Sequence, residues 1–212
     1  MANSKPTLGY WQLRGLAQPI RFLLTYLGVE VNEKRYSGFD QWQADKLNLG
    51  LAFPNVPYLI DGDLKLTESR AILRHFARDT AVYPKTADAI RTCDMLENVL
   101  WDIWFGLIRY CNSGLEPLKE YFENEIPKKI GYLNAFMENK KFILGNEISY
   151  VDFILYEILY HYTTYKAEYL DKYPALSQYK KSFEEIPAIA KYIASDDYIK
   201  GPCINPMAKI PI

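Results

Sequence analysis

Three short segments in the first third of the chain combine residue types that could hold and activate a small peptide. Tyr10 ends a strand-like segment, Asn55-Val56-Pro57 opens a second apolar segment, and Glu68-Ser69 precedes a helical pattern. A tyrosine hydroxyl has an ordinary pKa of about 10, so it stays protonated at neutral pH and can stabilise a thiolate by hydrogen bonding. Because the chain has 18 tyrosines, Tyr10 could equally be a packing residue.

The Asn55-Val56-Pro57 segment could offer backbone groups to an extended peptide. An X-Pro bond at the start of a strand can be cis, which turns the N–H and C=O of the preceding residue outward. Val56 would then pair with a peptide as an added strand does. An ordinary trans turn is the alternative, and the spacing does not decide between them.

The Glu68-Ser69 pair could bind the two charged ends of an amino acid. If a helix begins here, its free N–H groups and dipole attract a carboxylate, with the Ser69 hydroxyl assisting. Glu68 could accept an ammonium group. Ordinary helix capping is the alternative explanation.

A small mixed sheet is needed to position these segments. Short strands and helices alternate in the order βαβ and then ββα, and Asp61-Gly62 supplies the tight turn of a hairpin. The sequence therefore predicts a thioredoxin-like domain over residues 1–83. The expected strands are 7–11, 32–37, 57–60 and 64–66, the expected helices are 17–28 and 69–78, and a short connection spans 39–48.

Only helical periodicity follows a linker around Tyr83-Pro84. We therefore expect an all-helical domain over residues 84–212, which makes the fold class α/β plus all-α. Ser149 and Asp152 have the spacing of a helix capping box, and Ile148 and Phe153 could pack as its hydrophobic staple. The expected helices are 89–111, 118–139, 150–165, 174–186 and 187–195.

Composition argues against several classes of protein. The chain carries 25 basic and 26 acidic side chains with a net charge of −1, which gives no electrostatic case for nucleic acid or an anionic membrane. The N-terminal residues lack the apolar run of a signal peptide, so we expect a cytoplasmic protein. Cys93, Cys111 and Cys203 form no metal-like spacing with His75 and His161, so we expect reduced thiols, no metal and no prosthetic group.

The segments LGYWQLRGLAQPIR, LNLGLAFPNVPYLIDGDLKLTESRAILR and ILGNEISYVDF, in this order, resemble the cytosolic glutathione transferases, especially the mu class and its invertebrate relatives. They bracket residues 8–153 without a disruptive insertion. The resemblance implies a homodimeric detoxification enzyme that adds the glutathione thiolate to electrophilic carbons of small hydrophobic compounds. Glutathione would be its co-substrate.

The resemblance also implies a role for individual residues. Tyr10 would activate the glutathione sulfur, Asp102 would reach across a dimer interface to the neighbouring site, and Phe53 would insert between helices of the partner subunit. Pro57 would be cis. The residues that would contact the tripeptide are Trp11, Leu16, Trp42, Lys46, Asn55, Val56, Pro57, Glu68 and Ser69.

A strip of one helix could bind the hydrophobic acceptor. Trp101, Phe105, Ile108 and Asn112 recur at helical spacing, and with Leu13 they would form an apolar wall. Extra core packing explains the same spacing equally well.

Three departures from the mu-class pattern qualify these expectations. The loop before Trp42 is shorter, Glu68 stands where glutamine is usual, and Asn112 stands where a tyrosine is usual. Residues 201–212 align poorly, so we assign no site there. The alternatives to a transferase are a non-catalytic ligand carrier or structural protein, and a glutathione-dependent prostaglandin isomerase.

Overall fold

The first part of the chain folds around a four-stranded mixed sheet. A computed structural model describes residues 5–205 and 207–210. The strand order is β2-β1-β3-β4; β1 runs parallel to β2 and antiparallel to β3, and β3 pairs antiparallel with β4. The strands are β1 (Thr7–Trp11), β2 (Asn32–Tyr36), β3 (Tyr58–Asp61) and β4 (Leu64–Thr67).

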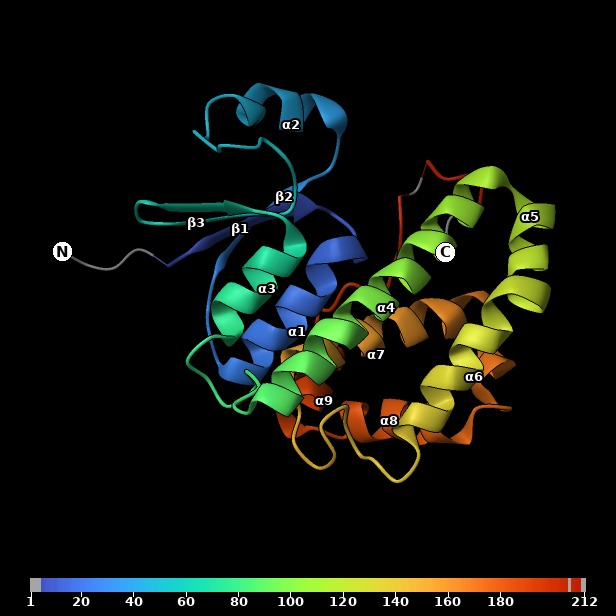
Figure 1. Cartoon of the computed structure of the whole chain (residues 1–212). Coiled ribbons are helices and arrows are strands. Elements are labelled where there is room, and N and C mark those ends of the chain that lie inside the picture. The colour runs from blue at the N-terminus through green and yellow to red at the C-terminus, as the bar shows by residue number, and fades with distance from the viewer. Residues whose placement is uncertain (1–4, 206, 211–212) are drawn as a thin grey trace.

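Helices lie on both faces of this sheet. Helices α1 (Gln18–Leu27) and α3 (Ser69–Ala77) pack together on one face, while α2 (Phe39–Lys46) lies across the other (Figure 1). A single 3-10 turn, η1 (Gly15–Ala17), joins β1 to α1. As predicted, Pro19 lies in the first turn of α1 and Gly28 ends it, with a φ of 67° that favours glycine. This layout confirms the thioredoxin-like half of the fold.

The second part of the chain contains helices joined by loops, and within its described residues the β structure is limited to two isolated bridges. The long helix α4 runs diagonally across the molecule, beside α1 and α3 on one side and α6 on the other (Figure 1). The elements of this second part are α4 (Ala87–Ser113), α5 (Leu115–Glu120), η2 (Tyr121–Glu125), α6 (Ile126–Met137), α7 (Tyr150–Tyr165), η3 (Ala167–Leu170), α8 (Pro174–Glu184) and α9 (Pro187–Ile193).

Helix α7 is the centre of the molecule. It packs against α1 from the first half and α4 from the second, so one hydrophobic core runs through both. The predicted capping box at its start is present, with Ser149 and Asp152 bonded reciprocally. The sheet therefore belongs to the first part of the chain and most helices to the second, but the two parts share one hydrophobic core.

The predicted helix 118–139 is confirmed over residues 118–137, and its winding changes within the segment. Helix α5 ends at Glu120, a wider π turn follows over Tyr121–Glu125, and α6 begins at Ile126. Pro127 lies in the first turn of α6 and has no N–H to donate to the carbonyl four residues earlier. The helical spacing of apolar residues continues through the π turn, which is why the sequence pattern does not reveal the turn.

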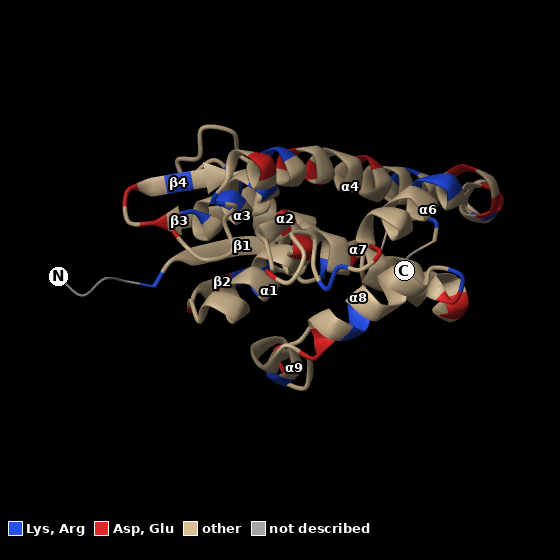
Figure 2. Cartoon of the chain, turned by 60° about the horizontal axis from the view of Figure 1, so that its bottom comes forward, with Lys and Arg blue, Asp and Glu red and all other residues tan. Residues whose placement is uncertain are grey.

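Charged residues are spread over the surface without a large region of one sign. Both signs occur along α4, whereas the charged residues of α6 are two lysines (Figure 2); the net charge of the chain is −1. Within the described residues, no helix is long and apolar enough to cross a bilayer.

Candidate functional site

Tyr10 lies at the carboxyl end of β1, where the chain turns toward α1. Its side chain is buried, and its hydroxyl oxygen accepts a hydrogen bond of 3.0 Å from the backbone N–H of Leu16. Gly15 makes this approach possible: a Cβ at that position would lie 2.5 Å from the Tyr10 oxygen, and its φ is +39°. The turn η1 therefore fixes the position of the phenol.

The environment keeps the Tyr10 hydroxyl protonated. Burial raises the pKa of Tyr10 to about 12, and the Leu16 N–H and the nearby Arg21 guanidinium oppose that shift only in part. The bond with Leu16 uses the oxygen as an acceptor, and among residues 5–205 and 207–210 no acceptor for the phenolic proton is recorded. Tyr10 is therefore a hydrogen-bond donor with its proton uncommitted.

Most of the aromatic and apolar residues expected around the tripeptide form one cluster with Tyr10. The cluster is separate from the main core and includes Tyr36 and Tyr58 from the sheet. Trp42 is only 4% exposed and stacks on Tyr58 at 6.2 Å between ring centroids, so much of its role is packing. The predicted members of the cluster are Tyr10, Trp11, Leu13, Leu16, Trp42 and Val56.

The Val56–Pro57 bond is cis, as the resemblance implied. The N–H of Val56 donates to the side-chain oxygen of Asn55 at 2.9 Å. A peptide that paired with Val56 would have to displace this bond. Lys46 is half-buried at the end of α2.

The Glu68-Ser69 pair lies at the start of α3, as the sequence predicted. Ser69 is buried in the first turn, and Glu68 is exposed with a φ of 72° and a ψ of 110°. This is a sparsely populated conformation for a residue other than glycine, and such strain concentrates at functional sites. Ser69 shares a gap of about 10 Å³ with Leu16 and Trp101, so the start of α3, η1 and α4 meet there.

The residues of the predicted acceptor site are divided between the main core and the Tyr10 cluster. Trp101 and Phe105 are in edge contact at 5.0 Å, and the Asn112 amide donates to the Ile108 carbonyl one turn earlier on the helix. Trp101 and Ile108 pack on the main core, whereas Leu13 belongs to the Tyr10 cluster.

The remaining members of the strip differ in exposure. Phe105 is 48% exposed, and Asp102 beside it is exposed on the same helix. Leu16 contacts both clusters and so lies between the two regions.

Sequence reasoning missed four buried ionisable residues next to this site: Arg14, Arg21, Glu157 and His161. Arg21 donates to the carbonyl of Leu13 at 2.9 Å and to Glu33 at 2.8 Å, which ties α1 to the turn and to β2. The available signal was the occurrence of Glu157 and His161 at i, i+4 in an otherwise apolar helix, because buried charges are normally paired.

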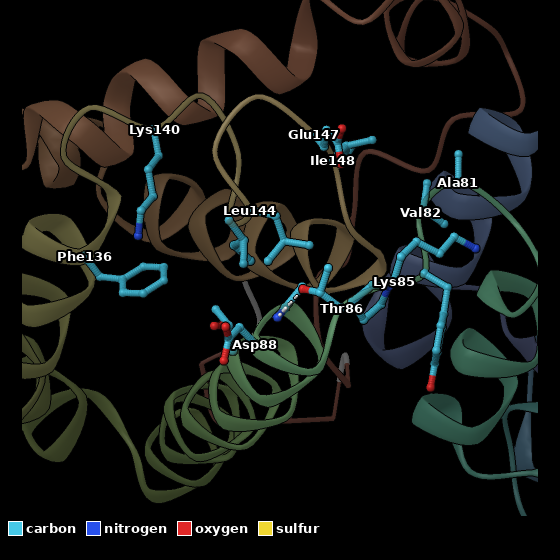
Figure 3. A pocket seen from close by; sticks show the side chains of 15 residues that line it. Ala81, Val82, Lys85, Thr86, Asp88, Phe136, Lys140, Leu144, Glu147 and Ile148 are labelled. Atoms are coloured by element: carbon cyan, nitrogen blue, oxygen red, sulfur yellow. Dashed lines mark hydrogen bonds between the residues drawn. The ribbon is translucent and has the colours of Figure 1, made fainter.

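A separate pocket of about 400 Å³ lies beside the linker between the two halves. It is formed by residues around Val82 and Thr86 and, across from them, Phe136, Lys140 and Ile148 (Figure 3). None of its lining residues is an expected site residue, and its charged side chains include both signs. This pocket therefore adds nothing to the Tyr10 site.

Comparison with known families assigns the fold around Tyr10. Residues 6–78 match the glutathione S-transferase N-terminal domain, and residues 101–196 match the glutathione S-transferase C-terminal domain. The chain belongs to the glutathione S-transferase family. Within this family, the segments with Tyr10, Val56 and Ser69 lie in the N-terminal match, and the strip on α4 lies in the C-terminal match.

Relatives of the mu class align with nearly the whole chain. Glutathione S-transferase Mu 1 from Bos taurus is 38% identical over 209 residues, covering 95% of this chain and 96% of the relative. A class-mu 26 kDa isozyme from Fasciola hepatica is 36% identical over 198 residues, covering 92% and 91% respectively. The solved structure of the glutathione S-transferase Blo t 8 superposes with a TM-score of 0.90 at 36% identity, covering 97% of this chain and 100% of that chain.

Proposed function

We propose that this protein is a cytoplasmic glutathione transferase that conjugates the glutathione thiolate to small hydrophobic electrophiles, in detoxification. The observation that carries the proposal is Tyr10: a buried phenol whose oxygen is held by the Leu16 N–H and whose proton is uncommitted. The full-length similarity to mu-class enzymes supports the same reaction.

The chemistry needs a donor that stays protonated next to a sulfur that does not. A free thiol has a pKa of about 8.5, so only a few per cent of it is ionised at pH 7. Because burial raises the pKa of Tyr10 to about 12, the phenol stays protonated and donates a hydrogen bond to the thiolate, whose thiol is the stronger acid. A hydrogen bond to a charged group is worth about 1.5–3 kcal/mol, which lowers the thiol pKa by about one to two units.

We propose that the tripeptide lies along the surface between η1, the Val56 segment and the start of α3. Val56 would pair with the cysteinyl backbone, Glu68 and Ser69 would hold the γ-glutamyl end, and Lys46 would attract the glycine carboxylate. Trp11, Leu16, Trp42 and Asn55 would complete the lining. The acceptor would occupy the side of the site formed by Leu13 and the strip on α4, from Trp101 to Asn112.

Replacing Tyr10 with phenylalanine tests the proposal. Tyr10→Phe removes only the hydroxyl, so kcat/KM for an aryl halide should fall about tenfold to a hundredfold at pH 6.5 while retention on immobilised glutathione persists. Tyr132→Phe is the matched control, because Tyr132 is 66% exposed on α6 and should give wild-type rates. A wild-type protein that binds glutathione but conjugates no aryl halide would instead support the non-catalytic carrier.

We also propose that the active unit is a homodimer. Exposed apolar side chains occur in the loop before β3 and on α4: Phe53 is 76% exposed, Met95 54% and Val99 38%. Aromatic and methionine side chains are enriched at protein–protein interfaces relative to the rest of the surface. Asp102, exposed on the same helix, would then reach the neighbouring glutathione site.

Phe53 provides the test of the dimer. Burying a phenylalanine contributes about 1.5–3 kcal/mol, so Phe53→Ala should raise the dimer dissociation constant about tenfold to a hundredfold in sedimentation analysis. Phe39→Ala is the matched control, because Phe39 is an equally large side chain, 65% exposed at the start of α2, for which no partner contact is proposed. Equal effects of both substitutions, or a monomeric wild-type protein, would contradict the proposal.

A further inference from the structure

A fully buried ion pair connects the turn that holds Tyr10 to the central helix α7. The Arg14 guanidinium donates to both carboxylate oxygens of Glu157, from Nε at 2.9 Å and from Nη2 at 2.6 Å. Both side chains are 0% exposed. Burying two charges is costly unless the geometry is good and the remaining hydrogen-bonding positions are filled.

His161 supplies the additional bond to this carboxylate. It lies one turn after Glu157 on α7, is 0% exposed, and its Nε2 is 2.8 Å from the Glu157 oxygen that Arg14 Nε also contacts. A carboxylate paired with arginine only accepts hydrogen bonds, so Nε2 carries the proton. One Glu157 oxygen is thereby held by donors from two different elements.

The other ring nitrogen of His161 lies on a ring that packs against Trp104. In the described part of the chain, Nδ1 has no partner, and neither does the indole N–H of Trp104 on α4. The two rings are 5.4 Å apart between centroids. With the proton on Nε2, His161 leaves Nδ1 as a hydrogen-bond acceptor.

Arg14 transmits this anchoring to the site, because it directly precedes η1. Its third nitrogen, Nη1, donates to the Ile199 carbonyl at 2.6 Å, and its backbone N–H donates to the Pro202 carbonyl at 3.1 Å. Gly15 N–H donates to the Cys203 carbonyl at 2.9 Å. The C-terminal segment thus fixes the same turn from its other side.

The other groups that face the ion pair are two tyrosines and a thiol. The guanidinium lies 3.7 Å from the Tyr160 ring centroid and 4.9 Å from that of Tyr198. Cys203 is buried nearby. Burial raises the pKa of Tyr160, Tyr198 and Cys203, so all three stay neutral around neutral pH.

We propose that His161 is a positioning residue for the conjugation reaction: it fixes the Glu157 carboxylate, which fixes Arg14 and with it the backbone from Arg14 to the Leu16 N–H that orients Tyr10. The inference rests on the proposed transferase function. A displacement of the donor by an ångström or less is enough to weaken a catalytic hydrogen bond severely.

The test compares two substitutions of His161. His161→Leu removes the bond to Glu157, whereas His161→Gln keeps an amide N–H near the Nε2 position. With His161→Leu, the apparent pKa of enzyme-bound glutathione should rise by about one unit, so kcat/KM for an aryl halide falls about tenfold at pH 6.5 and far less at pH 9. The KM for glutathione should change less than about threefold, and His161→Gln should restore most of the wild-type pH profile.

The matched control is His75→Leu, because His75 is the chain's other histidine and lies on α3 away from the cluster. It should leave the pH profile unchanged. If His161→Leu does not fold, His161→Asn provides the same test, since its short side chain places the amide at the Nδ1 position and cannot reach Glu157.

The outcomes separate the inference from the function on which it rests. A lower melting temperature of His161→Leu with an unchanged pH profile would overturn the positioning role while leaving the transferase intact. Absence of conjugation by the wild-type protein would overturn the proposed function itself. Titration of the thiolate absorbance in the glutathione complex measures the pKa of the bound thiol directly. A thiol pKa in His161→Leu equal to that in the wild-type protein would also overturn the inference.

Discussion

Replacing Asp152 with alanine should strongly destabilise the protein. The Asp152 side chain is 0% exposed and accepts three hydrogen bonds: 2.9 Å from the Ile143 N–H, and 2.7 Å each from the Ser149 N–H and hydroxyl. These bonds join the first turn of α7 to the loop that precedes it. Asp152→Ala removes all three acceptor contacts and leaves both N–H groups buried.

The expected cost follows from the groups that lose their partners. Loss of a helix cap costs about 1 kcal/mol, and each buried N–H left without an acceptor costs about 1–3 kcal/mol. The total is about 3–7 kcal/mol, which is a large part of the 5–15 kcal/mol that stabilises a typical domain. Because α7 packs against α1 and α4, the loss should affect the whole chain rather than one helix.

Urea unfolding followed by tryptophan fluorescence and circular dichroism measures this cost. Asp88→Ala is the matched control, since Asp88 also lies in the first turn of its helix but its side chain is 89% exposed. We expect a change below about 1 kcal/mol for the control. Equal effects of the two substitutions, or a cost below about 1 kcal/mol for Asp152→Ala, would refute the reasoning.

Two further predictions concern backbone strain and alkaline pH. Glu68→Gly should raise the free energy of unfolding by about 1 kcal/mol by relieving the positive φ. The KM for glutathione should rise, because the substitution removes the partner that we propose for the ammonium group. A decrease in stability, or an unchanged KM, would contradict this. Burial raises the pKa of Tyr10 to about 12 and also raises the pKa of Tyr150 and Tyr179. An acid with a raised folded-state pKa favours folding while protonated, so this stabilisation is complete below about pH 10 and is lost as the pH rises through about 12. The urea midpoint should therefore fall steeply above pH 10, and a midpoint constant to pH 11.5 would argue against it.

The sequence by itself determined the local features of the fold. Asp61-Gly62 marks the hairpin, Gly28 ends α1, and Ser149 with Asp152 begins α7, because each depends on backbone requirements within a few residues. The apolar period likewise identified α4 as a long helix facing a core. The same local logic missed the π turn before Pro127, because the spacing of apolar residues does not show a change in backbone hydrogen bonding.

Only the tertiary structure decided which distant groups meet. Arg14 and Glu157 are 143 positions apart, and their pairing depends on α7 packing between the two halves of the chain. Packing likewise placed Leu13 in the cluster that contains Tyr10, and it buried the Tyr10 phenol under η1. Burial and long-range contact set the pKa and the donor role of Tyr10, and neither is encoded in the residues next to it in the sequence.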